Sequence, residues 1–330
     1  MLQVFGVQEG RLTDLSPDPQ APIQTQVPEG AVWIDLNSPK RLEENLVEES
    51  LTIDIPTREE LAEIEASSRL YQEDGATFMT ATLIKRGLDD ERPEAAPVTF
   101  ILRGSQLVTV RYSEPRAFPI FIRRMQKPGQ CPTDGEGIFL SLLEAIVDRA
   151  ADHLEAVGRI IDETSLQVFE RSRGRRQRTK PFQELLIKVG EEGDFTSKMR
   201  ESLMSIGRLV AFFSAVIDQR QEVKEDRVRL KTLQRDIQSL ADHSTFLSGK
   251  ISFLLDAVLG MISIEQNGII KIFSVAAVVF LPPTLVASIY GMNFQFMPEL
   301  SLWFGYPLAL GLMVLSAVLP YFYFRAKGWL

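Results

Sequence analysis

Small and polar side chains recur every three or four residues along the last long helical stretch of this 330-residue chain. We call this face the polar stripe, and its members are Asp256, Gly260, Ser263, Asn267, Ile270, Ser274, Ala277, Leu281, Thr284, Ser288 and Gly291. Residues at this spacing share one face of an α-helix. Such a face either packs closely against another helix or lines a water-filled path. Packing stays open as an interpretation, because Ser and Thr hydroxyls also bond to carbonyls of their own helix.

Two members of the stripe favour water over packing. Asp256 and Asn267 carry oxygens that contact water and cations, and copies of Asp256 around an axis would repel unless cations lay between them. Leu281 and Ile270, or its neighbour Phe273, would then form apolar rings within a polar tube. Rings of this kind stop ions by dewetting. The stripe thus predicts a pore with apolar constrictions.

The stripe enters the first of two uncharged apolar runs, residues 272–290 and 302–324. A helix of about 20 apolar residues crosses a bilayer core of about 30 Å. Lys271 precedes the first run, and Arg325 and Lys327 follow the second. Because basic flanks stay on the cytoplasmic side, we expect both termini in the cytoplasm and the link outside. We therefore expect a multi-pass protein of the cytoplasmic (inner) membrane, in contact with lipid.

Composition excludes several classes of function. The net charge of −8 argues against a nucleic-acid partner. Cys131 is the single cysteine, which excludes an intrachain disulfide, and the two histidines, His153 and His243, are too few for a histidine-based zinc site. The sequence has no phosphate-binding loop of the Walker type and no catalytic constellation, so we expect neither an enzyme nor an organic cofactor. We also expect no signal peptide.

The first 128 residues predict a mixed α/β domain. Strand patterns lie at residues 2–7, 31–36, 77–84, 98–102 and 107–112, and helical patterns lie at 40–49 and 57–66. Thr57 and Glu60 form a capping box at the start of the second helix. Gly104-Ser105 marks a hairpin.

Residues 129–270 read as long cytoplasmic helices and a stalk, with breaks expected near 171–180, 190–194 and 218–225. The last helix has no breaker from about residue 228 to Pro282, so it continues into the membrane. Two membrane helices cannot enclose a channel, and the stripe must meet copies of itself. The expected fold class is an α+β soluble domain joined to an α-helical membrane protein. Its expected parts are residues 1–128, 129–270, a pore-lining span at 271–290, an external loop at 291–301, a second span at 302–324 and a basic tail at 325–330.

The segment Tyr290-Gly291-Met292-Asn293-Phe294 follows Phe280-Leu281-Pro282-Pro283-Thr284 and precedes Met297-Pro298-Glu299. This pattern, placed directly after the first span of a C-terminal hairpin, resembles the CorA magnesium transport family. The whole stretch of residues 264–330 and the segment 54–69 are similar to its enterobacterial-type branch. Length, topology and domain order agree over the whole chain.

The resemblance implies a homopentamer whose long helices form a funnel and whose first membrane helix lines the pore. It places Gly291, Met292 and Asn293 at an outer mouth that selects hydrated Mg²⁺, with passage of Co²⁺ and Ni²⁺ as well. Since Mg²⁺ holds its water tightly, amide oxygens of Asn293 suit recognition through the hydration shell.

The family is also gated by Mg²⁺ bound between cytoplasmic domains, usually through acidic pairs. The candidate ligands here are Glu73, Asp74, Glu225, Asp226 and Asp236. The match to the family is poor here, and each of these residues is more often an ordinary solvated carboxylate. Arg325 and Lys327 would form a basic ring at the cytoplasmic pore entrance, and their simpler role is to fix topology.

Two alternatives remain at this stage. The related ZntB-type zinc transporters depart from Met at the middle position of the motif, where this chain has Met292. A membrane-anchored oligomeric scaffold would need neither the amide of Asn293 nor a polar stripe across the bilayer.

Overall fold

The computed structural model describes residues 1–16, 26–61, 63, 65–85, 93–129, 131–172, 182–220, 224–293, 295 and 297–328. The chain divides into two compact units. The first comprises residues 1–171 with 177–255, and the second is made mainly of residues 256–330.

A seven-stranded mixed sheet forms the base of the first unit. Its strands are β1 (Leu2–Gln8), β2 (Arg11–Asp14), β3 (Ala31–Asn37), β4 (Leu70–Glu73), β5 (Ala76–Lys85), β6 (Glu94–Arg103) and β7 (Gln106–Arg111). They lie in the order β2-β1-β3-β7-β6-β5-β4. Only β3 and β7 pair in parallel among the described strands, with Trp33 beside Leu107.

All five strand patterns predicted from the sequence are confirmed. The predicted hairpin is also present, because Gly104 adopts a φ of +58° between the paired residues Arg103 and Gln106. The two edge strands, β2 and β4, were not predicted. Each has four residues, which is too short to show an alternating pattern.

The two faces of the sheet are both covered, and alternate residues of β3 point to opposite sides. On one side Ile34 and Leu36 pack with Val47 of helix α1 (Arg41–Leu51). On the other side Trp33 donates a hydrogen bond to Thr109, whose hydroxyl donates to Asp35.

Asp35 also accepts a forked ion pair from Arg111, with Nη2 2.8 Å from Oδ2, and both side chains are buried. These contacts satisfy the buried carboxylate.

Short helices follow or flank the strands: α2 (Arg58–Leu61), α3 (Ala66–Arg69) and α4 (Ala117–Met125). The Thr57–Glu60 capping box is confirmed, with the two side chains bonding each other's backbone N–H groups at 2.8 and 3.3 Å. The helix predicted over residues 57–66 is wrong in length, since α2 ends at Leu61.

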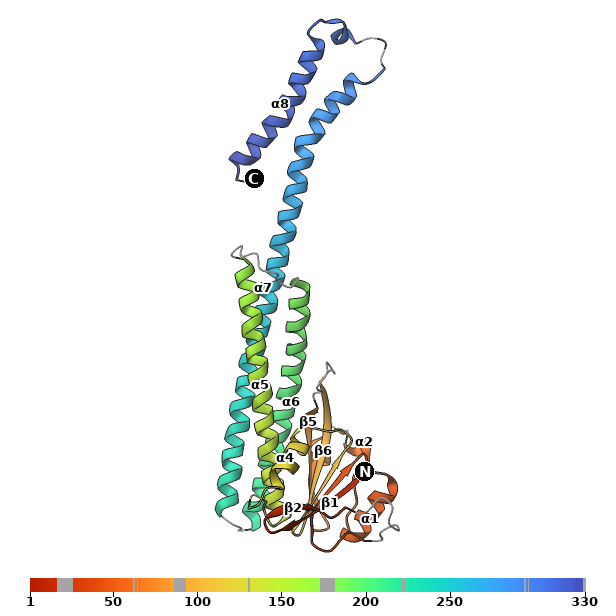
Figure 1. Cartoon of the computed structure of the whole chain (residues 1–330), viewed down its shortest axis with the longest axis vertical. Coiled ribbons are helices and arrows are strands. Elements are labelled where there is room, and N and C mark those ends of the chain that lie inside the picture. The colour runs from red at the N-terminus through yellow and green to blue at the C-terminus, as the bar shows by residue number, and fades with distance from the viewer. Residues whose placement is uncertain are drawn as a thin grey trace. The chain divides into compact units, whose positions relative to one another are not determined.

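Three long helices run side by side in the first unit: α5 (Gly135–Ser172), α6 (Phe182–Arg220) and the first part of α7 (Lys224–Tyr290) (Figure 1). Phe139 of α5 joins the sheet to α6, because its ring lies 5.3 Å from Phe100 of β6 and 5.0 Å from Phe213. Arg229 of α7 forms a bidentate ion pair with Glu144 of α5.

Helix α6 also covers the end of strand β5 that β4 does not reach. Ser202 donates a hydrogen bond to the carbonyl oxygen of Thr82, and the Thr82 N–H donates to Ser205. The helix thus satisfies backbone groups that an edge strand would otherwise expose.

The break expected near residues 190–194 is wrong, because α6 continues through both Gly190 and Gly193. A Cβ atom on Gly193 would lie 3.3 Å from a methyl group of Ile251 in α7. Gly193 therefore serves close packing between helices rather than a turn. The breaks expected near 171–180 and 218–225 fall largely on residues 173–181 and 221–223, which lie outside the described residues.

The second unit contains the end of α7, a 3-10 turn η1 (Pro298–Ser301) and helix α8 (Gly305–Ala326). Both α7 and α8 are long and apolar enough to cross a membrane. The second apolar run begins at Leu302, but its helix starts at Gly305 after the 3-10 turn.

Candidate functional site

The polar stripe lies on a single uninterrupted helix. Helix α7 runs through Pro282 and Pro283 to Tyr290, so all members of the stripe up to Ser288 belong to one element. Every stripe residue and Phe273 are exposed in the single chain. The exposed fractions of the proposed ring residues Ile270, Phe273 and Leu281 are 61%, 71% and 65%.

The opposite face of α7 is the one shielded within the chain. The residues between 275 and 290 that are buried or partly buried are Val275, Ala276, Val279, Pro282, Pro283, Val286 and Tyr290. At about 100° of rotation per residue, this set centres on the side of the helix opposite the polar stripe. Helix α8 runs back alongside this part of α7 (Figure 1). The second span of the same chain therefore leaves the later turns of the stripe open.

Two hydroxyls of the stripe bond within their own helix. Ser263 donates to the carbonyl of Leu259 at 3.1 Å, and Thr284 donates to Phe280 at 2.8 Å. Each of these hydroxyl oxygens keeps acceptor capacity. Their lone pairs can face water or a hydrated cation, but their protons are already used.

At its Lys271 end, the stripe also borders a groove. Asn267, Ile270 and Ser274 line this groove together with Phe324 of α8. The stripe is thus fully open only along its later turns.

The Gly-Met-Asn segment directly follows the last turn of α7. The N–H of Gly291 still donates to Ala287 at 2.9 Å, and the N–H of Met292 donates to Ile289 at 3.3 Å. Asn293 comes after these last helical hydrogen bonds. All three residues of the motif are exposed. The neighbouring Phe294 lies outside the described residues. The motif is therefore held by a helix end while its amide remains accessible.

The return from the link into α8 depends on a close backbone approach. A Cβ atom on Gly305 would clash with the carbonyl oxygen of Glu299. The N–H of Gly305 also donates to Leu302 at 2.9 Å. Gly305 thus allows η1 to fold against the start of α8.

The basic flanks of the two apolar helices meet at one end of the second unit. Lys271 of α7 donates from Nζ to the carbonyl of Gly328, 3.4 Å away, just after α8. Arg325 and Lys327 lie at this same end of α8. The tail residues 329–330 lie outside the described residues. The three cations thus mark the same side of the helical hairpin.

The candidate regulatory acids are spread over several elements. Glu73 and Asp74 lie at the turn between β4 and β5, and Glu225 and Asp226 lie in the first turn of α7. Within the described part of one chain, no group of three or more His, Cys, Asp and Glu side chains could hold a metal ion.

Among these candidates, Asp236 lies near other acids. It shares a groove with two acidic residues that the sequence did not single out. Glu144 and Asp148 line this groove with Asp236, together with the cations Arg124 and Arg229. Desolvation raises the pKa of Asp148, Arg124 opposes that rise, and Glu144 and Asp236 add to it. The sequence does show acidic residues four apart on α5, at Glu144 and Asp148. Their approach to Asp236 of α7 depends on how the two helices pack, which the sequence does not show.

Comparison with known proteins assigns the chain to a family. The family model described as "CorA-like Mg2+ transporter protein" matches residues 28–326. The chain belongs to the CorA family. The CorA resemblance of the Gly-Met-Asn segment is thereby confirmed.

Named relatives agree over full length. The Magnesium transport protein CorA of Escherichia coli K12 is 36% identical and that of Pasteurella multocida is 34% identical, each covering 100% of both chains. The solved CorA magnesium transporter of Methanocaldococcus jannaschii superposes with a TM-score of 0.73 at 17% identity, over 100% of this chain and 99% of that one. The predicted fold class, a soluble α+β domain with two transmembrane helices, is confirmed.

Proposed function

We propose that this protein transports Mg²⁺ across the cytoplasmic membrane as a homopentameric channel. The observation that carries the proposal is the polar stripe of α7, which is exposed in the single chain, whereas the residues of α7 between 275 and 290 that are shielded lie on the opposite face. A symmetric ring of chains would turn this face toward a common axis. Membership in the CorA family and the names of the full-length relatives support Mg²⁺ as the ion.

In this proposal the spans are residues 271–290 and 302–324, with both termini in the cytoplasm. Lys271, Arg325 and Lys327 support this orientation, because they gather at one end of the hairpin. The same arrangement would place Arg325 and Lys327 in a basic ring near the inner entrance.

Asn293 would select the ion at the outer mouth, together with Gly291 and Met292. Mg²⁺ dehydrates reluctantly, so a mouth that accepts hydrogen bonds from its first-shell waters can recognise it without stripping them. Five copies of an exposed amide oxygen would provide such acceptors. Co²⁺ and Ni²⁺ would pass by the same contacts.

The membrane potential is enough to drive uptake. Moving two charges through 100 mV yields about 4.6 kcal/mol. No nucleotide hydrolysis or organic cofactor enters this proposal, and the protein acts as a channel rather than an enzyme.

Cytoplasmic Mg²⁺ would close the channel by binding between neighbouring soluble domains. Since the described residues of one chain do not build a metal site, the ligands would come from two chains. Asp236 has the best surroundings among the candidates, because Asp148 and Glu144 line the same groove.

The test of selectivity is Mg²⁺ flux into liposomes carrying wild type or Asn293→Ala. We expect the variant to take up Mg²⁺ at least ten times more slowly than wild type, because the mouth loses its amide acceptors. A fluorescent Mg²⁺ indicator inside the liposomes measures the rate. Gln295→Ala is the matched control, since it removes another exposed amide two residues away.

Unchanged uptake in Asn293→Ala would remove the selectivity role. Wild-type liposomes that take up Zn²⁺ and not Mg²⁺ would replace the proposal with a zinc transporter. No flux of either ion would favour a scaffold.

A further inference from the structure

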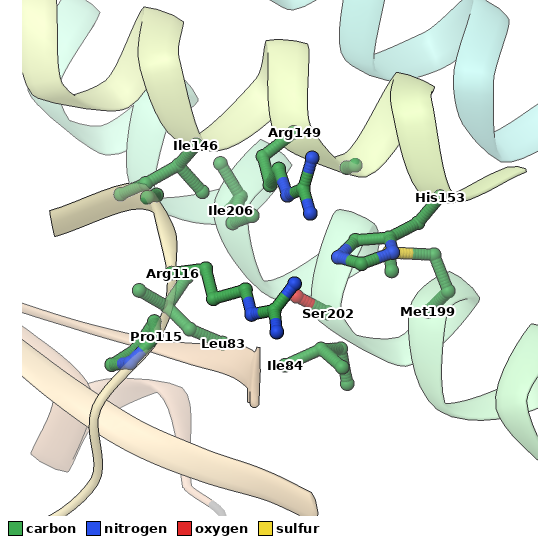
Figure 2. A pocket seen from close by; sticks show the side chains of 12 residues that line it. Leu83, Ile84, Pro115, Arg116, Ile146, Arg149, His153, Met199, Ser202 and Ile206 are labelled. Atoms are coloured by element: carbon green, nitrogen blue, oxygen red, sulfur yellow. The ribbon is translucent and has the colours of Figure 1, made fainter. Parts of the chain in front are cut away.

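A small cavity lies inside the first unit, where the sheet meets the helices (Figure 2). Strand β5, the start of α4, and helices α5 and α6 contribute its walls. Its volume is about 30 Å³, which is enough for one or two water molecules. Nothing in the proposed channel function uses this cavity.

Basic side chains converge on the cavity from two separate segments. Arg116 comes from the residue before α4, and Arg149 and His153 come from successive turns of α5. Figure 2 shows the two guanidinium groups and the imidazole turned toward the same space. No carboxylate lines the cavity among the described residues.

Both arginines keep a buried donor without a partner. Nη2 of Arg116 and Nε of Arg149 are buried, and neither has a hydrogen-bond acceptor among the described residues. A buried N–H of a charged group that lacks an acceptor costs more than an ordinary lost hydrogen bond. Within the described residues, these two donors are therefore left without an acceptor.

No acidic group within the cavity offsets this charge among the described residues. Nη1 of Arg149 forms a 3.1 Å ion pair with Asp152, but Asp152 is 64% exposed and does not line the cavity. Ser202 lines the cavity, yet its hydroxyl proton is donated to the Thr82 carbonyl. The N-terminal end of α4, at Ala117, adds the positive end of a helix dipole.

We infer that this cavity binds a small oxyanion of the phosphate or sulfate class. Guanidinium N–H groups match the oxygens of tetrahedral oxyanions in geometry and charge. A volume of about 30 Å³ excludes a sugar or base, and an oxyanion or one terminal phosphate of a larger molecule enters with small shifts of the two flexible arginine side chains. Bound there, the anion joins the sheet, α4 and α5, and so stabilises the junction of the two layers.

The direct test is equilibrium dialysis of radiolabelled inorganic phosphate against the full-length purified protein in detergent. We expect saturable binding of one phosphate per chain. Sulfate should compete, and chloride at matched ionic strength should not. A parallel experiment with ATP as competitor distinguishes free phosphate from the terminal phosphate of a nucleotide. If ATP displaces the label at a lower concentration than unlabelled phosphate does, the site belongs to the nucleotide's terminal phosphate.

Arg116→Gln and Arg149→Gln should each weaken phosphate binding at least tenfold. Arg159→Gln, an exposed position further along α5, should bind like wild type. Phosphate should also raise the apparent Tm of wild type by about 3 °C at ten times its dissociation constant, and leave both cavity variants unshifted.

Absence of saturable phosphate binding in wild type would overturn the inference, whatever the variants do. It would mean that water occupies the cavity. Equal displacement by chloride would overturn the oxyanion class. Since these readouts involve no Mg²⁺ flux, they stand or fall independently of the channel proposal.

Discussion

Asn293 and the stripe residues offer neutral oxygens at nearly every polar position, and Asp256 is the one stripe member with a formal charge. Neutral acceptors hold a hydrated divalent cation more weakly than carboxylates, so they favour passage over tight binding. Ser263 and Thr284 illustrate this, because their protons are used inside the helix while their oxygens remain acceptors. At this scale the proposed pore would be a path of weak contacts.

Cys131 gives a residue-level prediction that depends on pH. Burial raises the pKa of its thiol from the usual value near 9.0 to about 11. At pH 8 the thiolate fraction then falls to about one in a thousand, from about one in ten for an exposed thiol. We expect native protein to resist iodoacetamide at pH 8, with reactivity rising tenfold for each pH unit up to about 11.

Mass spectrometry after timed labelling measures this reaction, and protein in 6 M guanidinium chloride provides the control with an exposed thiol. Equal labelling rates in native and denatured protein at pH 8 would contradict the burial of Cys131.

Single residues also show where sequence reasoning stops. The Gly-Met-Asn motif could be recognised because its three residues are adjacent in the chain. Arg116, Arg149 and Ser202 come from three segments, and no spacing in the sequence predicts that they share a cavity. Asp236 was singled out from the sequence, but the groove that it shares with Glu144 and Asp148 was not predicted, for the same reason.

At the scale of elements, α7 joins two environments in one helix. Its early turns pack against α5 and α6, while its later turns present one face to α8 and leave the opposite face open. The three- and four-residue spacing of small and polar residues pointed to this face, and its role as the lining of an ion path stays a prediction. The same periodicity could have revealed α4, since Phe118, Phe121 and Met125 form its buried side.

Glycines could be interpreted only in part from the sequence, because one residue type serves two purposes and only the hairpin at Gly104 was predicted correctly. Gly104 supports a hairpin turn with positive φ, whereas Gly193 allows close packing inside a continuous helix. Short edge strands were missed because β2 and β4 depend on their partners rather than on their own pattern.

Gly305 provides the element-level prediction. In Gly305→Ala the added methyl group would clash with the backbone oxygen of Glu299, so η1 must shift away from the start of α8. We expect a loss of about 1–3 kcal/mol in folding free energy. The measurement is the apparent Tm of the purified protein in detergent.

Gly311→Ala is the matched control on the same helix, because a Cβ atom there meets nothing within 4 Å. Its apparent Tm should stay level or rise, since Ala favours helix over Gly by about 1 kcal/mol. Equal Tm values for the two variants would show that the approach of η1 to α8 is not tight.

At the scale of the whole molecule, a single chain leaves the later turns of the polar stripe uncovered. The described residues of one chain also hold no metal site. Family membership and domain order could be predicted from the sequence. The number of chains around the axis cannot be derived from one chain, because it depends on contacts between copies.

The central claim is that the polar stripe, and not the opposite face of α7, lines the path of the ion. Thr284 and Val286 test it as a matched pair, since they are two residues apart and lie on the two opposite faces. In a Cys131→Ala background, Mg²⁺ uptake into liposomes is measured before and after a positively charged thiol reagent is added. We predict that the reagent stops uptake through Thr284→Cys and leaves Val286→Cys unchanged. Block of Val286→Cys, with Thr284→Cys still conducting, would contradict the account.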